Sequence, residues 1–173
     1  TGSNFDNLIF FGKLTPQKGI LPLLHAFDHL WNNKFSKSLS VIGGDHFYHI
    51  EESYLKNWIN KKYKLWIKNG LLKLHGSLPP AQWGKILSQK SIVIIPSIVD
   101  NYPYTVLESM SRKNIVLGSI QGGQSEILIH GENGFLFDHQ KPNDLSEKIL
   151  AISKKPTTEL ETIAEAGLHS VLQ

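Results

Sequence analysis

Short apolar segments alternate with longer amphipathic segments along almost the whole chain, and this alternation constrains the fold more than any other feature. Short apolar runs bounded by glycine or proline are typical of buried strands, whereas apolar residues at helical spacing predict amphipathic helices. The predicted strands are residues 7–11, 38–42, 71–75, 91–96, 114–119 and 135–137. The predicted helices are residues 51–69, 142–154 and 159–172, with three more that begin near Pro16, Pro80 and Pro103.

Strands joined by helical crossovers form a parallel sheet, because each crossover returns the chain to the same end of the sheet. We therefore predict an α/β fold, a Rossmann-like doubly wound parallel sheet with helices on both faces, in one domain of 173 residues. Ligands bind such sheets at the carboxyl ends of the strands. Residues suited to ligand contact follow the predicted strands at that edge: Gly12, Lys13, Gly44, Gly76, Asp100 and Gly122.

Asp45 also follows a predicted strand, and it is either a ligand residue or a turn-forming aspartate. His46 and His49 lie close to it in the sequence. We find no convincing third ligand near them and predict no metal site.

The stretch 96–108 joins a strand end, a proline turn and a helix start. Pro103 fits the first turn of a helix, where its missing N–H costs nothing. The backbone N–H groups near Thr105 and Val106 are then free to bind an anion. Asp100 lies in the loop and Glu108 lies on the helix. Two carboxylates beside an anion pocket predict a ligand that carries both phosphate and hydroxyl groups.

A second anion-binding element follows the first predicted strand. Lys13 and Lys18 lie between that strand and the next helix, without the glycine and lysine spacing of a Walker loop. Lysines and helix N–H groups suit a diphosphate, and a carboxylate suits vicinal hydroxyls. Gly76, Ser77 and Leu78 offer backbone groups and an apolar surface for a base. Together these groups indicate a nucleotide sugar; the alternative is solvated lysines, a turn aspartate and a helix-start glutamate.

Three segments, FFGKLTPQKG, PSIVDNYPYTVLESM and GSIQGGQSEILIHGENGFLF, resemble the C-terminal donor-binding half of GT-B glycosyltransferases of the large retaining family 4. The resemblance runs from about residue 9 to residue 150. It implies diphosphate contacts for Lys13, where the family usually has arginine, and for Lys18. It also implies that Asp100, where the family usually has glutamate, contacts the donor sugar, and that Glu108 holds the ribose hydroxyls.

The resemblance extends to the backbone groups of the site. The implied catalytic residues are Lys13, Lys18 and Asp100, and the implied donor-binding residues are Gly12, Gly76, Ser77, Leu78, Asn101, Tyr102, Thr105, Val106 and Glu108. The amides of Asn101 and Tyr102 would face the sugar, and those of Thr105 and Val106 the phosphates. The family's bulky-residue–glycine turn after the first acid is replaced here by Asn101, Tyr102 and Pro103.

In function, the resemblance implies transfer of a hexosyl group with retention, from a UDP- or GDP-sugar to a glycan or lipid acceptor, as in polysaccharide biosynthesis. No metal is expected, because lysines and helix N–H groups can stabilise the leaving diphosphate and the sequence has no Asp-x-Asp. We expect the acceptor to be bound by an N-terminal domain absent from this chain, so that the isolated domain binds donor without turnover. The alternatives are a non-catalytic nucleotide-sugar-binding module, a subunit of a split glycosyltransferase, or another GT-B protein such as an epimerase.

Composition adds few constraints. The chain contains no cysteine, which excludes disulfides and thiol catalysis, and it contains no apolar run long enough to span a membrane. The N-terminal residues do not resemble a signal peptide, so we expect a cytoplasmic protein. Net charge is +3, and five lysines gather with two tryptophans between residues 56 and 68. A solvated helix face explains them most simply; a peripheral contact with the inner face of a membrane stays open, and no nucleic-acid partner is expected.

Overall fold

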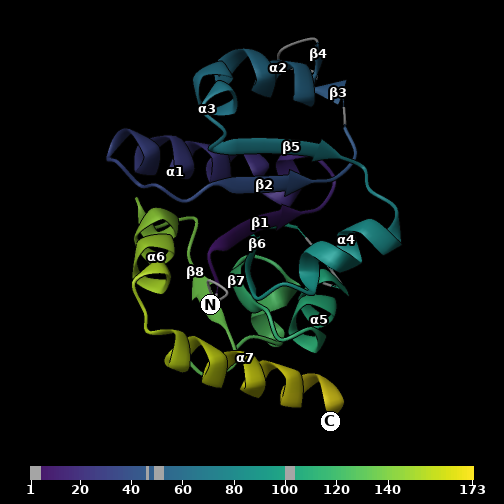
Figure 1. The fold of residues 1–173 in the computed structure, drawn as a ribbon, viewed down its shortest axis with the longest axis vertical. Coiled ribbons are helices and arrows are strands. Elements are labelled where there is room, and N and C mark those ends of the chain that lie inside the picture. Colours follow the sequence, from purple (N-terminus) through teal and green to yellow (C-terminus); the bar gives the residue numbers. More distant parts are fainter. Residues whose placement is uncertain (1–4, 46, 49–52, 100–103) are drawn as a thin grey trace.

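The computed structural model describes residues 5–45, 47–48, 53–99 and 104–173, and it confirms the predicted α/β fold (Figure 1). Within these residues, six parallel strands form one sheet between two layers of helices. The strands are β1 (Asn7–Phe11), β2 (Leu39–Ile42), β5 (Leu72–Gly76), β6 (Ser91–Ile95), β7 (Ile115–Ser119) and β8 (Phe135–Phe137). The helices are α1 (Ile20–Asn32), α2 (Leu55–Lys62), α3 (Lys64–Lys68), α4 (Pro80–Leu87), α5 (Tyr104–Ser111), α6 (Asp144–Ser153) and α7 (Thr157–Leu172).

The order of the strands fixes where a ligand can bind. Neighbouring strands follow the order β5-β2-β1-β6-β7-β8, and every neighbouring pair is parallel. The chain moves outward from β1 to β5, returns to the centre at β6, and then moves outward to β8 on the other side. The direction of winding therefore reverses between β1 and β6. In a doubly wound sheet this switch opens a crevice at the carboxyl ends of the two strands.

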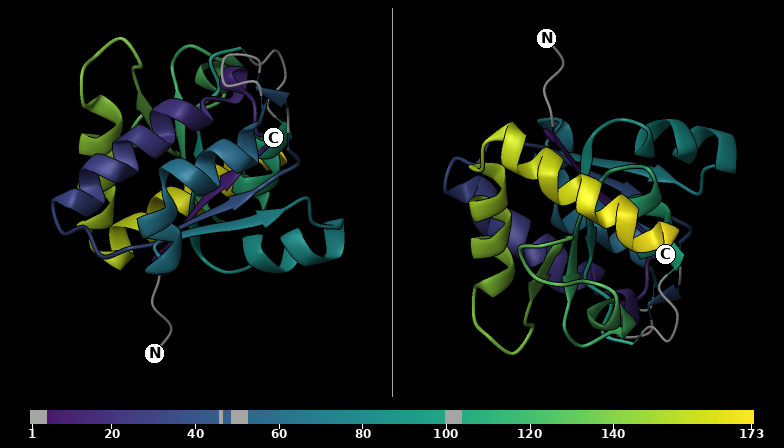
Figure 2. Two further views of the ribbon diagram at one scale, coloured as in Figure 1. Left: turned by 90° about the horizontal axis from the view of Figure 1, so that it is seen from above. Right: turned by 90° about the horizontal axis from the view of Figure 1, so that it is seen from below.

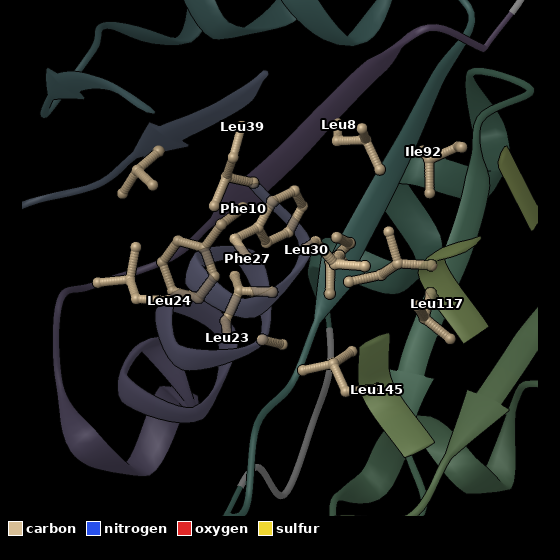
Figure 3. Packing of buried hydrophobic residues seen from close by; sticks show 14 of the residues in the cluster. Leu8, Phe10, Leu23, Leu24, Phe27, Leu30, Leu39, Ile92, Leu117 and Leu145 are labelled. Atoms are coloured by element: carbon tan, nitrogen blue, oxygen red, sulfur yellow. The ribbon is translucent and has the colours of Figure 1, made fainter. Parts of the chain in front are cut away.

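Residues of β1 alternate between the two faces of the sheet, as the period of a strand requires. Leu8 and Phe10 belong to a cluster on the α1 side, and Ile9 belongs to a second cluster with α4 and α5. Figure 3 shows side chains of the first cluster, in which Phe27 and Leu30 of α1 pack against the strands. Every residue of β6 and β7 is buried, which explains why these two strands are continuous apolar runs.

Helix α7 covers the lower face of the molecule in Figure 1 and runs diagonally across it when seen from below (Figure 2). Its first turns contribute Leu160, Ile163 and Ala164 to the cluster on the α1 side, whereas Val171 near its end packs with the α5 cluster. Helix α7 therefore packs against both core clusters, one on each face of the sheet. It also brings the C-terminal end of the described chain close to α5, which begins directly after the switch between β1 and β6.

The prediction of one continuous helix over residues 51–69 is wrong. Ser53–Tyr54 form a short strand, β4, which pairs with β3 (Phe47–Tyr48) outside the main sheet. The helical part then divides at Tyr63, although the sequence there has neither glycine nor proline. The division follows from packing on α1: the Tyr63 ring is buried, and the indole N–H of Trp66 donates to Asp28 Oδ1 at 2.6 Å. Burial and the charge of Asp28 raise the pKa of Tyr63 to about 12.

Asp45 is a helix cap in this structure. Its Oδ1 accepts a hydrogen bond from the backbone N–H of Lys56, at the start of α2, at 2.9 Å. This contact satisfies one of the N–H groups that a helix start leaves unpaired. His46 and His49 lie outside the described residues.

Candidate functional site

The segments that follow β1 and β6 are joined to each other directly. The Ile98 N–H donates to the Gln17 carbonyl at 2.8 Å, and Gly19 packs against the backbone of Pro96. A Cβ built on Gly19 would lie 1.9 Å from the Pro96 carbonyl oxygen, so only glycine fits this approach. Lys18 lies between Gln17 and Gly19 in the sequence, the two residues that contact the β6 segment. The structure therefore holds Lys18, one of the predicted diphosphate contacts, at the switch point.

Local sequence explains the shape of the β1 segment. Pro16–Lys18 form a single 3-10 turn, η1, and the Thr15 hydroxyl caps it by accepting the Lys18 N–H at 3.3 Å. Gly19 then adopts the left-handed conformation, with φ +77°, and α1 starts at the next residue. The helix predicted to begin near Pro16 therefore begins at Ile20, after this separate turn. Leu14, in the same segment, is buried in the hydrophobic core.

Gly12 and Lys13 differ in what they can offer a ligand. The Gly12 N–H donates to the Ile42 carbonyl at 3.0 Å, and a Cβ on Gly43 would lie 1.7 Å from the Gly12 carbonyl oxygen. Gly12 therefore fastens the end of β1 to the end of β2. The side chain of Lys13 is exposed and that of Lys18 is half-buried. Both lysines lie in the segment that follows β1, and Lys18 is held more closely against the β6 segment.

Helix α5 is the next helix after β6, the strand that pairs with β1. The first four N–H groups of an α-helix have no partner within the helix, so the N–H groups of Thr105 and Val106 belong to its anion-binding end. The Val106 side chain is fully buried and anchors this end in the core. Asp100, Asn101 and Tyr102, the other predicted residues of this loop, lie outside the described residues.

Glu108 lies one turn into α5 and borders an open groove of about 400 Å³. Its Oε1 accepts a hydrogen bond from Arg112 Nε at 2.8 Å, and Arg112 Nη2 forms an ion pair with the same oxygen at 2.8 Å. Among the described residues, its second oxygen, Oε2, accepts no hydrogen bond. Arg112 in turn lies 5.7 Å from the ring centroid of Trp83, which contacts Phe11 of β1 at 5.1 Å between ring centroids. The carboxylate is thus oriented at one oxygen and open at the other.

The predicted base contacts Gly76, Ser77 and Leu78 do not line this groove but lie at the end of β5 and in the segment that leads to α4. Gly76 ends β5 with φ +70°, and its carbonyl accepts the Gly43 N–H at 2.9 Å. Ser77 is exposed, and Leu78 packs with the cluster that includes Trp83 of the groove. The residues from Gly76 to the start of α4 therefore connect the outer strand to the wall of the Glu108 groove.

The sequence interpretation missed a buried polar network that holds the end of β6. Gln124 is fully buried, and its amide nitrogen donates to the Ser97 carbonyl at 3.0 Å and to the Ser119 hydroxyl at 2.6 Å. The Ser119 hydroxyl donates to the same carbonyl. Gln124 lies in the 3-10 turn η3 (Gly123–Glu126), inside the third segment that resembles the glycosyltransferase family. One signal was available: Gly118 interrupts the apolar run of β7, and its Cβ would lie 2.8 Å from Gln124 Cγ.

A second set of contacts joins the segments after β6, β7 and β8. The His139 ring nitrogen Nε2 lies 2.8 Å from the Pro96 carbonyl oxygen, and the backbone N–H of His139 donates to Gln121 Oε1 at 3.2 Å. The Gln121 amide donates to Asp138 at 2.6 Å. The backbone N–H of Gln140 and then this amide hold the pKa of Asp138 below its ordinary value. Hydrogen bonds therefore connect Pro96, after β6, with the segments that follow β7 and β8 at the carboxyl edge of the sheet.

A larger cavity, about 480 Å³, lies between α1 and the segment before α6, and none of the predicted site residues lines it. Three of its carboxylates, those of Asp28, Asp138 and Asp144, already accept hydrogen bonds from the protein itself. The groove beside Glu108 and the neighbouring carboxyl ends of β1 and β6 are the better candidates for a ligand site. No group of three or more potential metal ligands is found in the described ranges.

Comparison with known proteins identifies the family of this chain. The family model described as glycosyl transferases group 1 matches residues 3–168. The chain belongs to this family. An uncharacterised glycosyltransferase of Methanocaldococcus jannaschii is 28% identical over 146 residues, which cover 83% of this chain and 37% of that protein. The lipopolysaccharide 1,2-N-acetylglucosaminetransferase of Salmonella typhimurium is 28% identical over 131 residues, which cover 74% of this chain and 34% of that enzyme.

Solved structures identify the GT-B fold of this group 1 domain. Anabaena HepE in complex with UDP superposes with a TM-score of 0.78 at 21% identity, covering 97% of this chain and 44% of HepE. The C-terminal domain of the group 1 glycosyl transferase LpcC of Francisella tularensis superposes with a TM-score of 0.81 at 19% identity, covering 96% of this chain and 84% of that domain. The chain spans about a third of the length of the two curated relatives named above. None of its helices in the described ranges is both long and apolar enough to cross a bilayer.

Proposed function

We propose that this chain is the donor-binding domain of a retaining hexosyltransferase that transfers a sugar from a UDP- or GDP-sugar to a glycan or lipid acceptor. Membership in the group 1 family supports sugar transfer, and the relatives named above are glycosyltransferases. HepE has been solved with UDP and with UDP-glucose, which supports a nucleotide-diphosphate sugar as the ligand.

One observation carries the proposal: Lys18 lies between two residues that bind the β6 segment, where the winding of the sheet reverses. Lys18 and the N-terminal end of α5 thereby contribute positive charge to one crevice. A diphosphate there would gain charge-assisted hydrogen bonds and the favourable end of a helix dipole. Lys13 would add a further cation from the same segment.

The groove suits the nucleoside part of the ligand. Arg112 fixes Glu108 through Oε1, which leaves Oε2 to accept the ribose hydroxyls. The base would lie against Gly76, Ser77 and Leu78. Asp100, with the amides of Asn101 and Tyr102, would contact the sugar.

In catalysis, Lys13, Lys18 and the α5 N–H groups would stabilise the charge that develops on the leaving diphosphate. These groups are placed before the reaction begins, so we propose transfer without a metal ion. The acceptor would be bound by an N-terminal domain of the same enzyme, at the cytoplasmic side of the membrane. This chain alone would then bind donor but not turn over.

Isothermal titration calorimetry of the chain with uridine, UMP, UDP and the guanosine series tests these assignments. Lys18→Ala should weaken the binding of UDP by about 1.5–3 kcal/mol, the usual value of a hydrogen bond to a charged group, and leave the binding of uridine unchanged. Lys154→Ala, at an exposed lysine far along the chain at the end of α6, is the matched control and should change neither.

Glu108 is tested by a double-difference experiment. Glu108→Ala should weaken uridine and UDP equally, and 2′-deoxy-UDP should bind the variant as well as UDP does, because the partner of the hydroxyl is gone. If neither nucleotide diphosphate binds at millimolar concentration, the donor-site proposal is wrong. If the variant still discriminates against the deoxy ligand, the role given to Glu108 is wrong.

A further inference from the structure

Charge is distributed very unevenly along this chain. Residues 53–99 contain eight lysines and no aspartate, glutamate or arginine, which gives this stretch a formal charge of +8 in a chain of net charge +3. The rest of the chain therefore carries −5. All eight lysines are exposed, and within the described residues Lys90 is the one of them that pairs with a carboxylate, that of Glu161.

Five of these eight lysines, Lys56, Lys61, Lys62, Lys64 and Lys68, lie on α2 and α3 at one end of the molecule. Helices α2 and α3 lie beyond β5, the outer strand of the sheet, and α7 with its acidic residues lies at the opposite end (Figure 1). Lys61 and Lys62 lie in the last turn of α2, and Lys64, Leu65 and Lys68 lie on α3, which begins directly after the division at Tyr63. Leu65 is 58% exposed among these cations, and the Lys62 ammonium lies 4.7 Å from the ring centroid of the half-buried Trp58.

We propose that the α2–α3 face, defined by Lys61, Lys62, Lys64, Leu65 and Lys68, docks this domain on an anionic lipid surface. Clustered lysines gain free energy near anionic headgroups, and an exposed leucine among them can enter the boundary between headgroups and acyl chains. The face contains lysine but no arginine, the residue that binds phosphates in a fixed bidentate geometry. Diffuse attraction to a charged surface therefore fits it better than recognition of a nucleic acid.

The position of this face is compatible with the proposed donor site. Strands β2 and β5 run alongside the α2–α3 end, and their carboxyl ends point sideways rather than toward it (Figure 1). A flat surface placed against α2 and α3 would leave the carboxyl edge of the sheet uncovered. The charged face and the crevice between β1 and β6 can thus be occupied at the same time.

Vesicle cosedimentation of the 173-residue chain tests the proposal. Phosphatidylcholine vesicles that contain about one-third phosphatidylglycerol should bind the chain at about 50 mM salt and release it at about 500 mM, because salt screens the attraction. Vesicles of phosphatidylcholine alone should not bind it. Each lysine near an anionic surface changes the partition coefficient by about fivefold, so K61Q/K64Q should lower it by at least one order of magnitude.

The double variant K141Q/K154Q is the matched control, because it removes the same charge from exposed positions outside the α2–α3 face. It should change the partition coefficient by less than about twofold, and urea unfolding checks that both variants remain folded. Absence of binding to the anionic vesicles at low salt would overturn the proposal. Equal losses in the two variants would show an effect of net charge alone, and tighter binding to an oligonucleotide than to vesicles at the same salt would assign the face to nucleic acid.

Discussion

Gly19→Ala tests whether the close contact between the β1 and β6 segments holds the site together. Gly19 has φ +77°, and a new Cβ would lie 1.9 Å from the Pro96 carbonyl oxygen. Gly70 has nearly the same φ, +74°, but nothing lies within 4 Å of its Cβ position. Gly70→Ala is therefore a matched control that carries the backbone cost without the clash. Both changes restrict the unfolded chain in the same way, so that effect cancels in the comparison.

The difference between the two variants can be estimated. A left-handed conformation costs an L-residue about 1–2 kcal/mol, which is the expected loss for Gly70→Ala. In Gly19→Ala the contact must also open by about 1 Å, and backbone shifts forced by overpacking typically cost about 1–3 kcal/mol more. We expect total losses in the free energy of unfolding of about 2–5 kcal/mol for Gly19→Ala.

Urea unfolding followed by tryptophan fluorescence measures both losses, and calorimetry with UDP measures the consequence for the site. Gly19→Ala should weaken UDP because it moves Lys18 relative to the β6 segment, whereas Gly70→Ala should leave the affinity unchanged. Equal destabilisation by the two variants would refute the steric argument. Native UDP affinity in Gly19→Ala, with the expected loss of stability, would refute the link between this contact and the ligand site.

Three further predictions concern stability. Lys113 has φ +58°, a left-handed conformation that is costly for every residue except glycine. Lys113→Gly should therefore raise the free energy of unfolding by about 0.5–1 kcal/mol, although the exposed ion pair with Glu165 is lost. Lys113→Ala keeps the backbone cost and should not raise this free energy. Gln124→Leu should lower that free energy by about 1 kcal/mol in chemical denaturation, because the Ser97 carbonyl and the Ser119 hydroxyl each lose a buried donor, while the Ser119 hydroxyl still donates to that carbonyl. Burial opposes ionisation of Asp144, but hydrogen bonds from Lys148 and from a backbone N–H outweigh it and lower the pKa of Asp144. Its ionised form therefore stabilises the fold above the unfolded pKa near 4, that contribution is lost as pH falls through the lower folded pKa, and Asp144→Asn should flatten acid unfolding over this range.

The alternation of short strands with amphipathic helices was enough to predict the sheet, because each element obeys a local rule. The apolar runs of β6 and β7 indicated strands covered on both faces, and both are fully buried. The prediction failed at Tyr63, where a helical pattern continues but the helix divides. The cause is packing of Tyr63 and Trp66 on α1, a contact between distant residues that local periodicity does not contain.

The local sequence predicted where two residues of the candidate site lie in the fold: Lys18 follows β1, and Glu108 lies one turn into α5. Their contacts with a ligand stay predictions. The contact of Glu108 with Arg112 has an ordinary i, i+4 spacing that many solvated helix faces share, so the sequence gives no reason to single it out. Gln124 was missed because a glutamine beside two glycines is typical of an exposed turn, and only the fold buries it.

The contacts that shape the site are made largely by backbone carbonyls. Gln17, Pro96 and Ser97 each contribute a carbonyl oxygen, so the side chains of these residues do not determine the contacts. A frame of this kind depends on the small volume of Gly19 and on the amide of Gln124, while side chains that point at the ligand can change without disturbing it. Lysine in place of the family's arginine at residue 13 would therefore change how tightly the donor is held, not how the crevice is built.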